Sequence, residues 1–505
     1  MELKMVSVGI FWVIPDEVSG QRILEFKKDY GVSDADRNGF INYPYSHYET
    51  WCGVNGLGGD CYKYPRGRVI YNAKLGKHRI FADECVWQST IENIAKLFDI
   101  EDYELYRDEH YVCSFCSVRR GGERPTLNYN ILRGRNKIGE NLIEITYGKT
   151  KILVELGKAL DGGDELSDLE KTVLNTKYNA VVASHYHADH AGLIEYKTDC
   201  PIYIGSGAYR ILQAMNEYRA KRMPNNITTY KNGKAFTVDG VRITPFLCDH
   251  SAFDSYMLLF EAGGKSILYT GDFRFHGRKD KDKLLAALPK YVNVLIHEGT
   301  NAGSDKPCFT ESELEDRLVD IMSKNGPVFV IQSATNMDRL VSVYRAAKRT
   351  NRILYEDNYA ALMTCAAGGK IPRPDVFSDV YAYTPRYIGG RRKDLFLELE
   401  NKRGIRDVVR GKKFVMIVRA SMLGYMQKLS KAMSLTGATL VYSMWSGYKS
   451  DPTTAEFLRG VGDMGVDTVD VHTSGHASNG DILLLKQTVS AGEYVAVHTC
   501  VDCGQ

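Results

Sequence analysis

The sequence lacks any apolar run that approaches the roughly 18 residues needed for a membrane-spanning helix, so we expect no membrane anchor of this kind. The apolar stretch at residues 5–14 is short and has no small-residue cleavage site, which favours a buried strand over a signal peptide. Internal repeats and low-complexity segments are also lacking. The net charge of +3 is too small to indicate a nucleic-acid-binding protein by itself.

A regular disulfide framework is lacking as well. The 11 cysteines are odd in number and scattered, a distribution more typical of the reducing cytoplasm than of a secreted protein. Two pairs have the spacing C-x-x-C, Cys113 with Cys116 and Cys500 with Cys503. Together they offer four thiolates for a tetrahedral zinc site. The pairs lie far apart in the sequence, and ordinary thiols are the simpler interpretation.

The length of 505 residues predicts two or three domains, and the apolar content of 44% is typical of globular proteins. The first unit is expected to be a small α+β domain with a hairpin near 69–82, followed by a helix that begins at the capping box Ser89–Glu92. Further along, short strands give way to alternating strands and helices typical of a parallel sheet, and then to strands again. The predicted bounds are 1–120 for the first unit and 303–471 for the parallel-sheet unit. Between and after them lie the two parts of one core, 126–302 and 472–505.

The stretch SHYHADHAG at 184–192 places three histidines and an aspartate within six positions, directly after an apolar run. In an extended segment, residues two apart point to the same side, so His185 and His187 can bind one ion together. The chain then turns into a helix, where Asp189 and His190 face a neighbouring position. Imidazole and carboxylate ligands suit zinc, with manganese or iron as alternatives. Four such groups crowded together are costly to bury unless a metal binds them.

Further donors stand at the ends of predicted strands. His250 ends VRITPFLCDH, Asp272 ends SILYTGD, and His498 follows EYVAV. A carboxylate such as Asp272 can bridge two ions, because each of its oxygens can bind one. Any one of these three residues taken alone is also compatible with an ordinary structural role. Together with the opening motif, they predict a binuclear metal site.

These residues resemble the metallo-β-lactamase superfamily. The 22-residue step from His250 to Asp272 resembles its β-CASP branch, the group of RNase J and the pre-mRNA 3′-end processing endonuclease. Glu298 in IHEGTN and His476 in SGHAS, which lies 22 residues before His498, fit the same branch. The resemblance covers residues 126–505 and implies an αββα sandwich interrupted by an α/β cap. The chain departs from the family at Glu155, where a structural aspartate is more common, and in having only seven residues after His498.

The resemblance implies a zinc-dependent phosphodiester hydrolase with two metal ions, most simply a ribonuclease that cuts internally or from a 5′ end. It assigns His185, His187 and His250 to one ion. The second ion takes Asp189, His190 and His498, and Asp272 bridges the two. The catalytic residues are Asp189, as part of the site that activates water, His476 as general acid, and Glu298, which orients His476 and keeps it cationic.

Nucleic acid, and RNA rather than DNA, is the substrate that the resemblance implies. Residues 386–413 carry ten basic and four acidic side chains, a net charge of +6 that is compatible with phosphate contacts or with a solvated surface. Polar residues at predicted strand ends of the cap are candidate phosphate ligands: Ser333, Thr335, Asn336, Arg419 and Ser421.

Alternative functions stay open. One is a hydrolase of a small ester or cyclic phosphate, another is a DNA-directed nuclease, and a third is a catalytically silent partner subunit. The silent subunit predicts eroded ligands, whereas all seven ligand positions are filled here. Three alternative roles stay open for the first 120 residues: they guide substrate, form a homodimer, or close the C-terminal edge of the core.

Overall fold

The computed structural model describes residues 125–159, 165–304, 308–324, 326–384 and 413–499, together with a few short segments outside these ranges. Within 1–120 it describes four strands in the order β1-β2-β3-β4: β1 (Val13–Pro15), β2 (Gly67–Asn72), β3 (Lys77–Asp83) and β4 (Tyr103–Asp108). Strands β2 and β3 pair antiparallel with Val69 opposite Ile80, which confirms the predicted hairpin. The expected helix at Ser89–Glu92 and both C-x-x-C pairs lie outside the described residues.

The first sheet of the core has six strands in the order β10-β9-β8-β7-β6-β5. The hairpins β5-β6 and β6-β7 are antiparallel, whereas β7 through β10 run parallel. The bounds are β5 (Asn128–Arg133), β6 (Leu142–Tyr147), β7 (Thr150–Val154), β8 (Ala180–Val182), β9 (Ile202–Gly205) and β10 (Ile227–Tyr230). The helical elements of this half are α5 (Asp168–Asn175), α6 (Ala188–Ala191), η1 (Ile194–Tyr196) and α7 (Ser206–Arg219).

The second sheet also has six strands, in the order β11-β12-β13-β14-β15-β23. The bounds are β11 (Phe236–Val238), β12 (Val241–Cys248), β13 (Ser255–Ala262), β14 (Lys265–Tyr269), β15 (Tyr291–Glu298) and β23 (Ser490–Val497). Every residue of β13 is buried, because one face meets the other sheet and the opposite face meets helices. These helices are α8 (Lys281–Ala287) and α16 (Asn479–Thr488).

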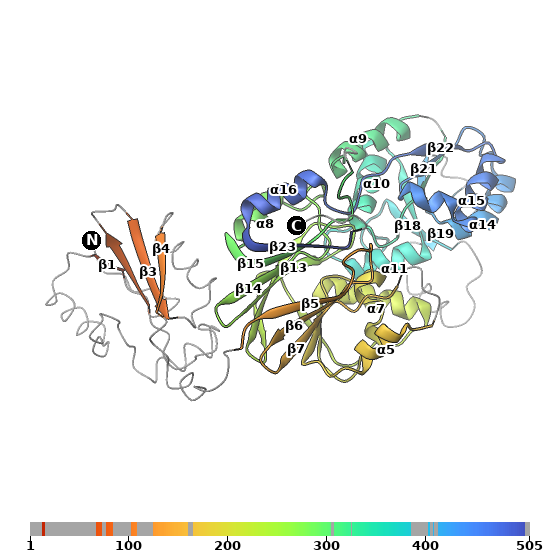
Figure 1. The fold of residues 1–505 in the computed structure, drawn as a ribbon. Helices are drawn as coiled ribbons and strands as arrows, with labels where there is room; N and C mark the ends of the chain where they lie inside the picture. Colours follow the sequence, from red (N-terminus) through yellow and green to blue (C-terminus); the bar gives the residue numbers. More distant parts are fainter. Residues whose placement is uncertain are drawn as a thin grey trace.

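Three apolar layers hold the sandwich together. Between the sheets, side chains such as Ile152 and Phe260 form one cluster. On the outer face of the first sheet, Ile211 of α7 packs with Ile202 of β9 in a second cluster, and α8 and α16 contribute to a third beneath the second sheet. Figure 1 shows α8 and α16 on one side of the two sheets and α5 and α7 on the other, which is the predicted αββα order.

A third sheet forms the cap, and its seven strands are all parallel, in the order β19-β18-β17-β20-β16-β21-β22. The strand bounds are β16 (Val328–Ile331), β17 (Ile353–Asp357), β18 (Val380–Tyr383), β19 (Lys402–Arg403), β20 (Phe414–Val418), β21 (Thr439–Tyr442) and β22 (Asp467–Asp470). Its helical elements are α9 (Glu311–Met322), α10 (Met337–Arg349), α11 (Asn358–Ala367), η2 (Ala420–Met422), α14 (Leu423–Ala432), η3 (Ser446–Ser450) and α15 (Pro452–Gly462).

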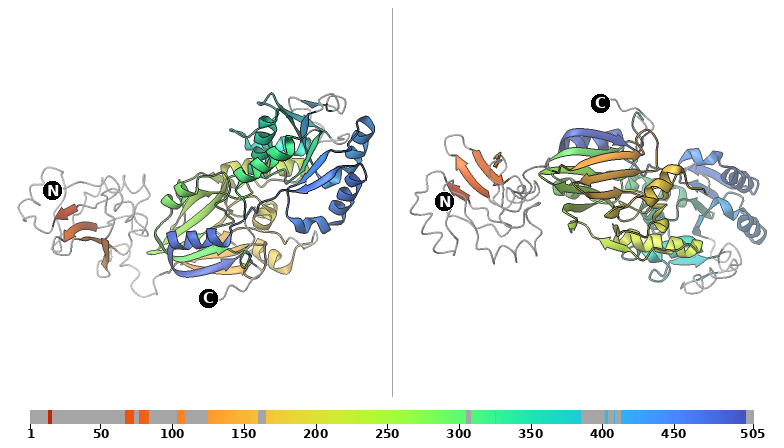
Figure 2. Two further views of the ribbon diagram at one scale, coloured as in Figure 1. Left: turned by 90° about the horizontal axis from the view of Figure 1, so that it is seen from above. Right: turned by 60° about the horizontal axis from the view of Figure 1, so that its bottom comes forward.

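The cap is an insertion between two parts of the core. The chain leaves the core after β15 and returns after β22, and the last described strand, β23, pairs in parallel with β15 (Figure 2). The predicted fold class, an αββα sandwich with an α/β cap, is therefore confirmed, while the exact domain bounds stay a prediction. Because the cap strands are parallel, their carboxyl ends meet at one edge of the sheet. Among the described helices, none has the length and apolar character that crossing a membrane requires.

Candidate metal centre

The opening motif lies where β8 ends. His187 takes extended backbone angles immediately before α6, while Asp189 and His190 lie inside that short helix. The nitrogen donors of His185, His187 and His250 all lie within 4.8 Å of one another. His250 follows β12 of the other sheet, and its Nε2 lies 3.2 Å from Nδ1 of His187. The two sheets of the sandwich thus supply one trio of histidines.

A second group of donors adjoins the first. It consists of Asp189, His190, Asp272 and His498, whose ligand atoms also lie within 4.8 Å of one another. Asp272 is the shared member, because its Oδ2 is near imidazole nitrogens of both groups. These distances are 3.2 Å to His190, 3.7 Å to His250, 3.8 Å to His498 and 4.0 Å to His185. All seven residues predicted as ligands converge on one place.

His476 and Glu298 lie at the edge of the same centre. His476 Nδ1 is 3.1 Å from Glu298 Oε2 and 3.6 Å from Asp272 Oδ2. The other oxygen of Glu298 accepts hydrogen bonds from the backbone N–H groups of Phe273, at 2.8 Å, and Ala477, at 3.3 Å. Glu298 therefore fixes both the loop that carries Asp272 and the loop that carries His476.

The donor atoms of the centre are buried, and several of them have no hydrogen-bond partner within the described part of the protein. They are Nε2 of His185 and both carboxylate oxygens of Asp272. Buried polar atoms without partners cost free energy, so native proteins rarely leave several of them in one place. Imidazole and carboxylate are the ligands that divalent transition metals prefer, so these residues fit a divalent metal site.

Neighbouring groups orient the histidines through the ring nitrogens opposite the centre. His185 Nδ1 is 2.9 Å from the hydroxyl of Ser184, and His250 Nδ1 donates to the carbonyl of Gly475 at 2.6 Å. Thr300 Oγ1 lies 2.7 Å from His498 Nδ1 and 3.1 Å from His476 Nδ1. Such partners fix the tautomer and direction of ligating imidazoles. All three lie inside the stretches SHYHADHAG, SGHAS and IHEGTN, but their supporting roles were not predicted.

Glu155, which departs from the family pattern, occupies a supporting position. Its carboxylate is fully buried, accepts from the Ser184 N–H at 3.1 Å and lies 3.3 Å from His190 Nδ1. Glu155 and His498 both have positive φ, at 64° and 53°, which is uncommon for residues other than glycine. Strained backbone of this kind clusters at functional sites. The longer glutamate side chain thus still reaches the histidine that it supports.

Burial governs the electrostatics of the histidine trio. Loss of hydration lowers the pKa of His187 to about 4 and lowers the pKa values of His185 and His250 well below the usual value. Neutral imidazole is the form that binds metal. For Asp272, burial opposes ionisation, but the nearby His190 and His498 outweigh it and hold its pKa well below normal. The carboxylate is therefore charged and able to bind cations.

The pKa of His476 moves in the opposite direction. Burial disfavours its charged form, yet Glu298 and Asp272 outweigh burial and raise the pKa to about 9. The predicted pairing of His476 with Glu298 is thus present as a short contact.

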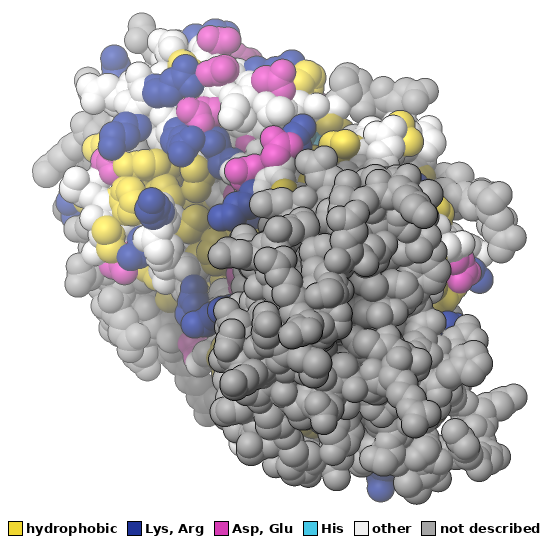
Figure 3. All heavy atoms as spheres, turned by 90° about the vertical axis from the view of Figure 1, so that its left-hand side faces the viewer, with side chains coloured by type: hydrophobic (Ala, Val, Ile, Leu, Met, Phe, Trp, Pro, Cys, Tyr) yellow, Lys and Arg dark blue, Asp and Glu magenta, His cyan; other side chains and the backbone are white. Residues whose placement is uncertain are grey.

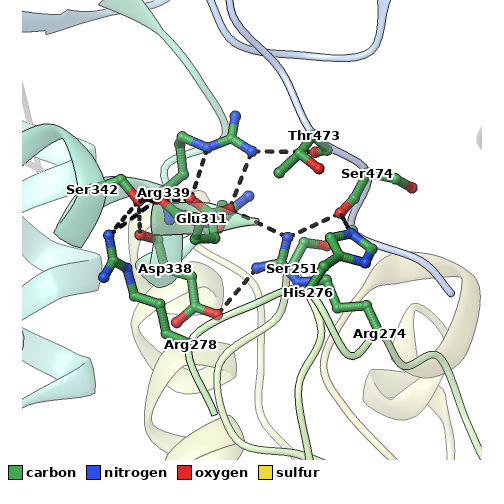
Figure 4. Close-up of polar contacts among 12 residues, drawn as sticks. Ser251, Arg274, His276, Arg278, Glu311, Asp338, Arg339, Ser342, Thr473 and Ser474 are labelled. Atoms are coloured by element: carbon green, nitrogen blue, oxygen red, sulfur yellow. Dashed lines mark hydrogen bonds and ion pairs between the residues drawn. The ribbon is translucent and has the colours of Figure 1, made fainter. Parts of the chain in front are cut away.

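Behind the metal centre lies a buried ion network that the sequence did not reveal. We use this name for Arg274, Glu311, Asp338 and Arg339, which Figure 4 labels, and for Asp249, with their hydrogen-bond partners. All the named residues except the half-buried Asp338 are buried. Arg274 donates to Asp249 at 2.8 Å, to Asp338 at 3.1 Å and to the carbonyl of Ser474 at 2.9 Å. Glu311 of α9 accepts from both Arg274 and Arg339, each at 3.2 Å. The network joins the cap helices to the loops that carry His250 and His476.

The cap residues predicted to bind phosphate lie at the carboxyl ends of β16 and β20. Ser333 and Ser421 are exposed, while Thr335 is buried. The carbonyl of Thr335 accepts a hydrogen bond at 2.9 Å from the hydroxyl of Tyr186, which lies in the histidine motif at 184–192. Asn336 caps α10 by accepting from the Arg339 N–H. Arg419 is bound by Asp357. The structure thus places the Ser333–Asn336 loop beside the metal centre, and phosphate binding by these residues stays a prediction.

The basic stretch 386–413 lies almost entirely outside the described residues. On the face drawn in Figure 3, the Lys and Arg side chains of the described residues are interspersed with Asp and Glu. The described part of this face therefore offers no single-signed surface for phosphate.

Comparisons with known proteins agree with this geometry. Residues 167–330 match the model of the beta-lactamase superfamily domain. The chain is 26% identical over 251 residues to Ribonuclease J of Mycoplasma pneumoniae, covering 46% of this chain and 43% of that protein. It is 24% identical over 254 residues to Endoribonuclease ysh1 of Emericella nidulans, covering 43% of this chain and 28% of that protein. The chain thus spans less than half the length of these curated relatives.

Among solved structures, the fold resembles a protein of unknown function from Enterococcus faecalis V583. The TM-score is 0.60 at 19% identity, and the match covers 74% of this chain and 94% of the other. This likeness concerns the fold alone. The family model and the named relatives confirm the resemblance to the metallo-β-lactamase superfamily and its β-CASP branch.

Proposed function

We propose that this chain, with its β-CASP metallo-β-lactamase fold, is a metal-dependent phosphodiester hydrolase that acts on RNA. The observation that carries the proposal is the convergence of two ligand groups on Asp272, a buried carboxylate that lies within 4.0 Å of imidazoles from both groups. A single carboxylate between two sets of donors is the arrangement expected for a bridging ligand.

The residues that would hold two zinc ions are those named above, with His185, His187 and His250 on one side. Asp189, His190 and His498 lie on the other, and Asp272 is shared. When bound, such ions lower the pKa of water toward neutrality and neutralise charge on the phosphate oxygens. Ser184, Gly475 and Thr300 fix the directions of the imidazoles before substrate arrives.

His476 is suited to protonate the leaving oxygen. Its Nδ1 faces Glu298, so Nε2 is the atom left to donate a proton, and the side chain remains 23% exposed. Glu298 stabilises the imidazolium form and fixes the ring. The role rests on this geometry, since a general acid must be held within hydrogen-bond reach of the group that it protonates.

Two observations support RNA as the substrate. The curated relatives are named as ribonucleases and an endoribonuclease. The Ser333–Asn336 loop of the cap contacts the metal-binding motif through Tyr186, so a cap-bound polymer would pass close to the centre. A hydrolase of a small ester has no need of these cap loops.

The test is cleavage of labelled RNA and DNA oligonucleotides by the purified protein, with and without chelator. We expect RNA cleavage that chelator abolishes and zinc or manganese restores. Preferred cleavage of DNA would reassign the substrate. Activity on small esters without activity on either polymer would overturn the proposal.

A further inference from the structure

Two exposed aromatic side chains, Trp445 and Tyr448, lie in the segment that follows β21. Their exposed fractions are 61% and 51%, which is high for large rings. Their ring centroids are 5.3 Å apart and the planes meet at 88°, an edge-to-face contact. Exposed rings that pack on each other, rather than into a core, mark a surface for interaction with another molecule.

The backbone fixes the Trp445 ring. A Cβ atom added to Gly447 would lie 2.2 Å from two carbons of the ring, so the ring lies directly against this glycine. The carbonyl of Trp445 accepts from the Tyr448 N–H at 3.1 Å and from the Tyr442 hydroxyl at 3.3 Å. The ring therefore has one supported side, while more than half of its surface is open to a ligand.

The buried ion network connects these rings to the metal centre. Arg339 donates to the carbonyl of Ser443 at 3.1 Å and to the carbonyl of Thr473 at 3.2 Å. Trp445 lies two residues after Ser443, and His476 lies three residues after Thr473. These steps correspond to at most about 7 Å and about 11 Å of extended chain. One guanidinium therefore holds both segments at the carboxyl edge of the cap sheet.

The basic side chain next to these two rings already forms an ion pair with an acidic one. Lys449 is 2.6 Å from Asp470, and its Nζ lies 4.9 Å from the Tyr442 ring centroid. A phosphate-binding surface would present free basic groups, whereas this one presents flat aromatic faces. Every nucleobase has a π-face that stacks on such rings, independently of sequence.

We propose that Trp445, supported by Gly447 and Tyr448, stacks with an unpaired base of single-stranded RNA whose scissile phosphate lies at the metal centre. This inference rests on the proposed function and adds that the RNA substrate is bound as a single strand. Because Arg339 holds both segments, stacking limits which phosphates of the strand reach His476.

The first test measures binding of a fluorescein-labelled ten-nucleotide RNA with phosphorothioate linkages by anisotropy, with cleavage of unmodified RNA followed in parallel. The substitution Trp445→Ala should weaken binding by about tenfold, the scale of one stacked base. Trp445→Phe should restore much of the loss. Gly447→Ala, which displaces the ring, should also weaken binding.

The matched control is Tyr291→Ala. Tyr291 is 43% exposed but begins β15, the strand whose opposite end carries Glu298, so its removal should leave RNA binding unchanged. Circular dichroism melts of each variant verify that it is folded.

The second test places a single abasic nucleotide at each position of the RNA in turn. One position should weaken binding to the wild-type protein and have no further effect on Trp445→Ala, because the base and the ring form one contact. Equal RNA affinity of the wild type and Trp445→Ala would overturn this proposal alone, and is the result expected if the rings bind a protein partner. Failure of the wild type to bind or cleave any RNA would overturn both proposals.

Discussion

Two buried polar clusters lie side by side in this protein and differ in how well their atoms are satisfied. In the ion network, Oε1 of Glu311 accepts from Arg274 and Arg339, each at 3.2 Å, and Oε2 accepts from Ser342 at 2.6 Å. In the candidate metal centre, neither oxygen of Asp272 has a hydrogen-bond partner among the described residues, although five imidazoles lie within 4.0 Å of its Oδ2. A buried cluster whose polar atoms all have hydrogen-bond partners needs no ligand. A buried cluster whose polar atoms lack such partners indicates a ligand-binding site.

The comparison predicts that substitutions in the two clusters have different consequences. The largest effect belongs to Asp272→Asn, which keeps the shape but removes the shared negative charge. Hydrolysis of RNA should fall by at least about 10³-fold, because the ligand common to both groups is lost. The matched change Asp249→Asn, next to His250 but in the ion network, should retain bound metal. Rates measured at the same added zinc concentration, with bound metal determined in parallel, compare the two variants. Equal activity of Asp272→Asn and wild type would contradict the distinction between the clusters.

The second effect separates His476 from the ligands. His476→Ala should lower the rate of phosphodiester cleavage by about 10²- to 10⁴-fold, the usual contribution of a general acid, while metal content is unchanged. Substrates with a better leaving group should recover part of the rate, because they need less protonation. Metal analysis and a leaving-group series provide the measurement. Loss of metal from this variant would make His476 a ligand instead.

The third effect concerns stability. Glu311→Gln leaves Arg274 and Arg339 buried with a neutral partner, and breaking a buried ion pair of this kind costs about 3–5 kcal/mol of unfolding free energy. Urea unfolding of the metal-free protein measures the change. An unaltered unfolding midpoint would show that the network contributes little, and would weaken its contrast with the metal centre.

The smallest effect is a pH dependence of the same network. Arg339 and Arg274 outweigh burial and lower the pKa of Glu311 from 4.5 to about 2. Since the folded-state pKa is depressed, the stabilisation is fully present above pH 4.5 and is lost as the pH falls through about 2. Its size is on the order of 3 kcal/mol. Urea midpoints across this window should converge for wild type and Glu311→Gln, and parallel curves would contradict the assignment.

The same contrast explains what the sequence could and could not predict. The candidate ligands were accessible because metal chemistry restricts such residues to a few types with fixed spacing, as in His185, His187 and Asp189. The parallel α/β character of the cap followed from the alternation of apolar runs and amphipathic helices, whereas its strand order did not. The roles of Thr300 and Glu311 were not accessible, because these residues meet His476 and Arg274 only through folding. The ion pair between Arg419 and Asp357 was hidden for the same reason.

The central claim is that the unsatisfied atoms around Asp272 bind divalent metal. Its most direct test is the metal content of the purified protein, determined by inductively coupled plasma mass spectrometry after loading with zinc and dialysis. The account predicts two ions per chain in the wild type and in Asp249→Asn, with loss from Asp272→Asn. A wild-type protein that retains no metal, or an Asp272→Asn variant that retains both ions, would contradict it.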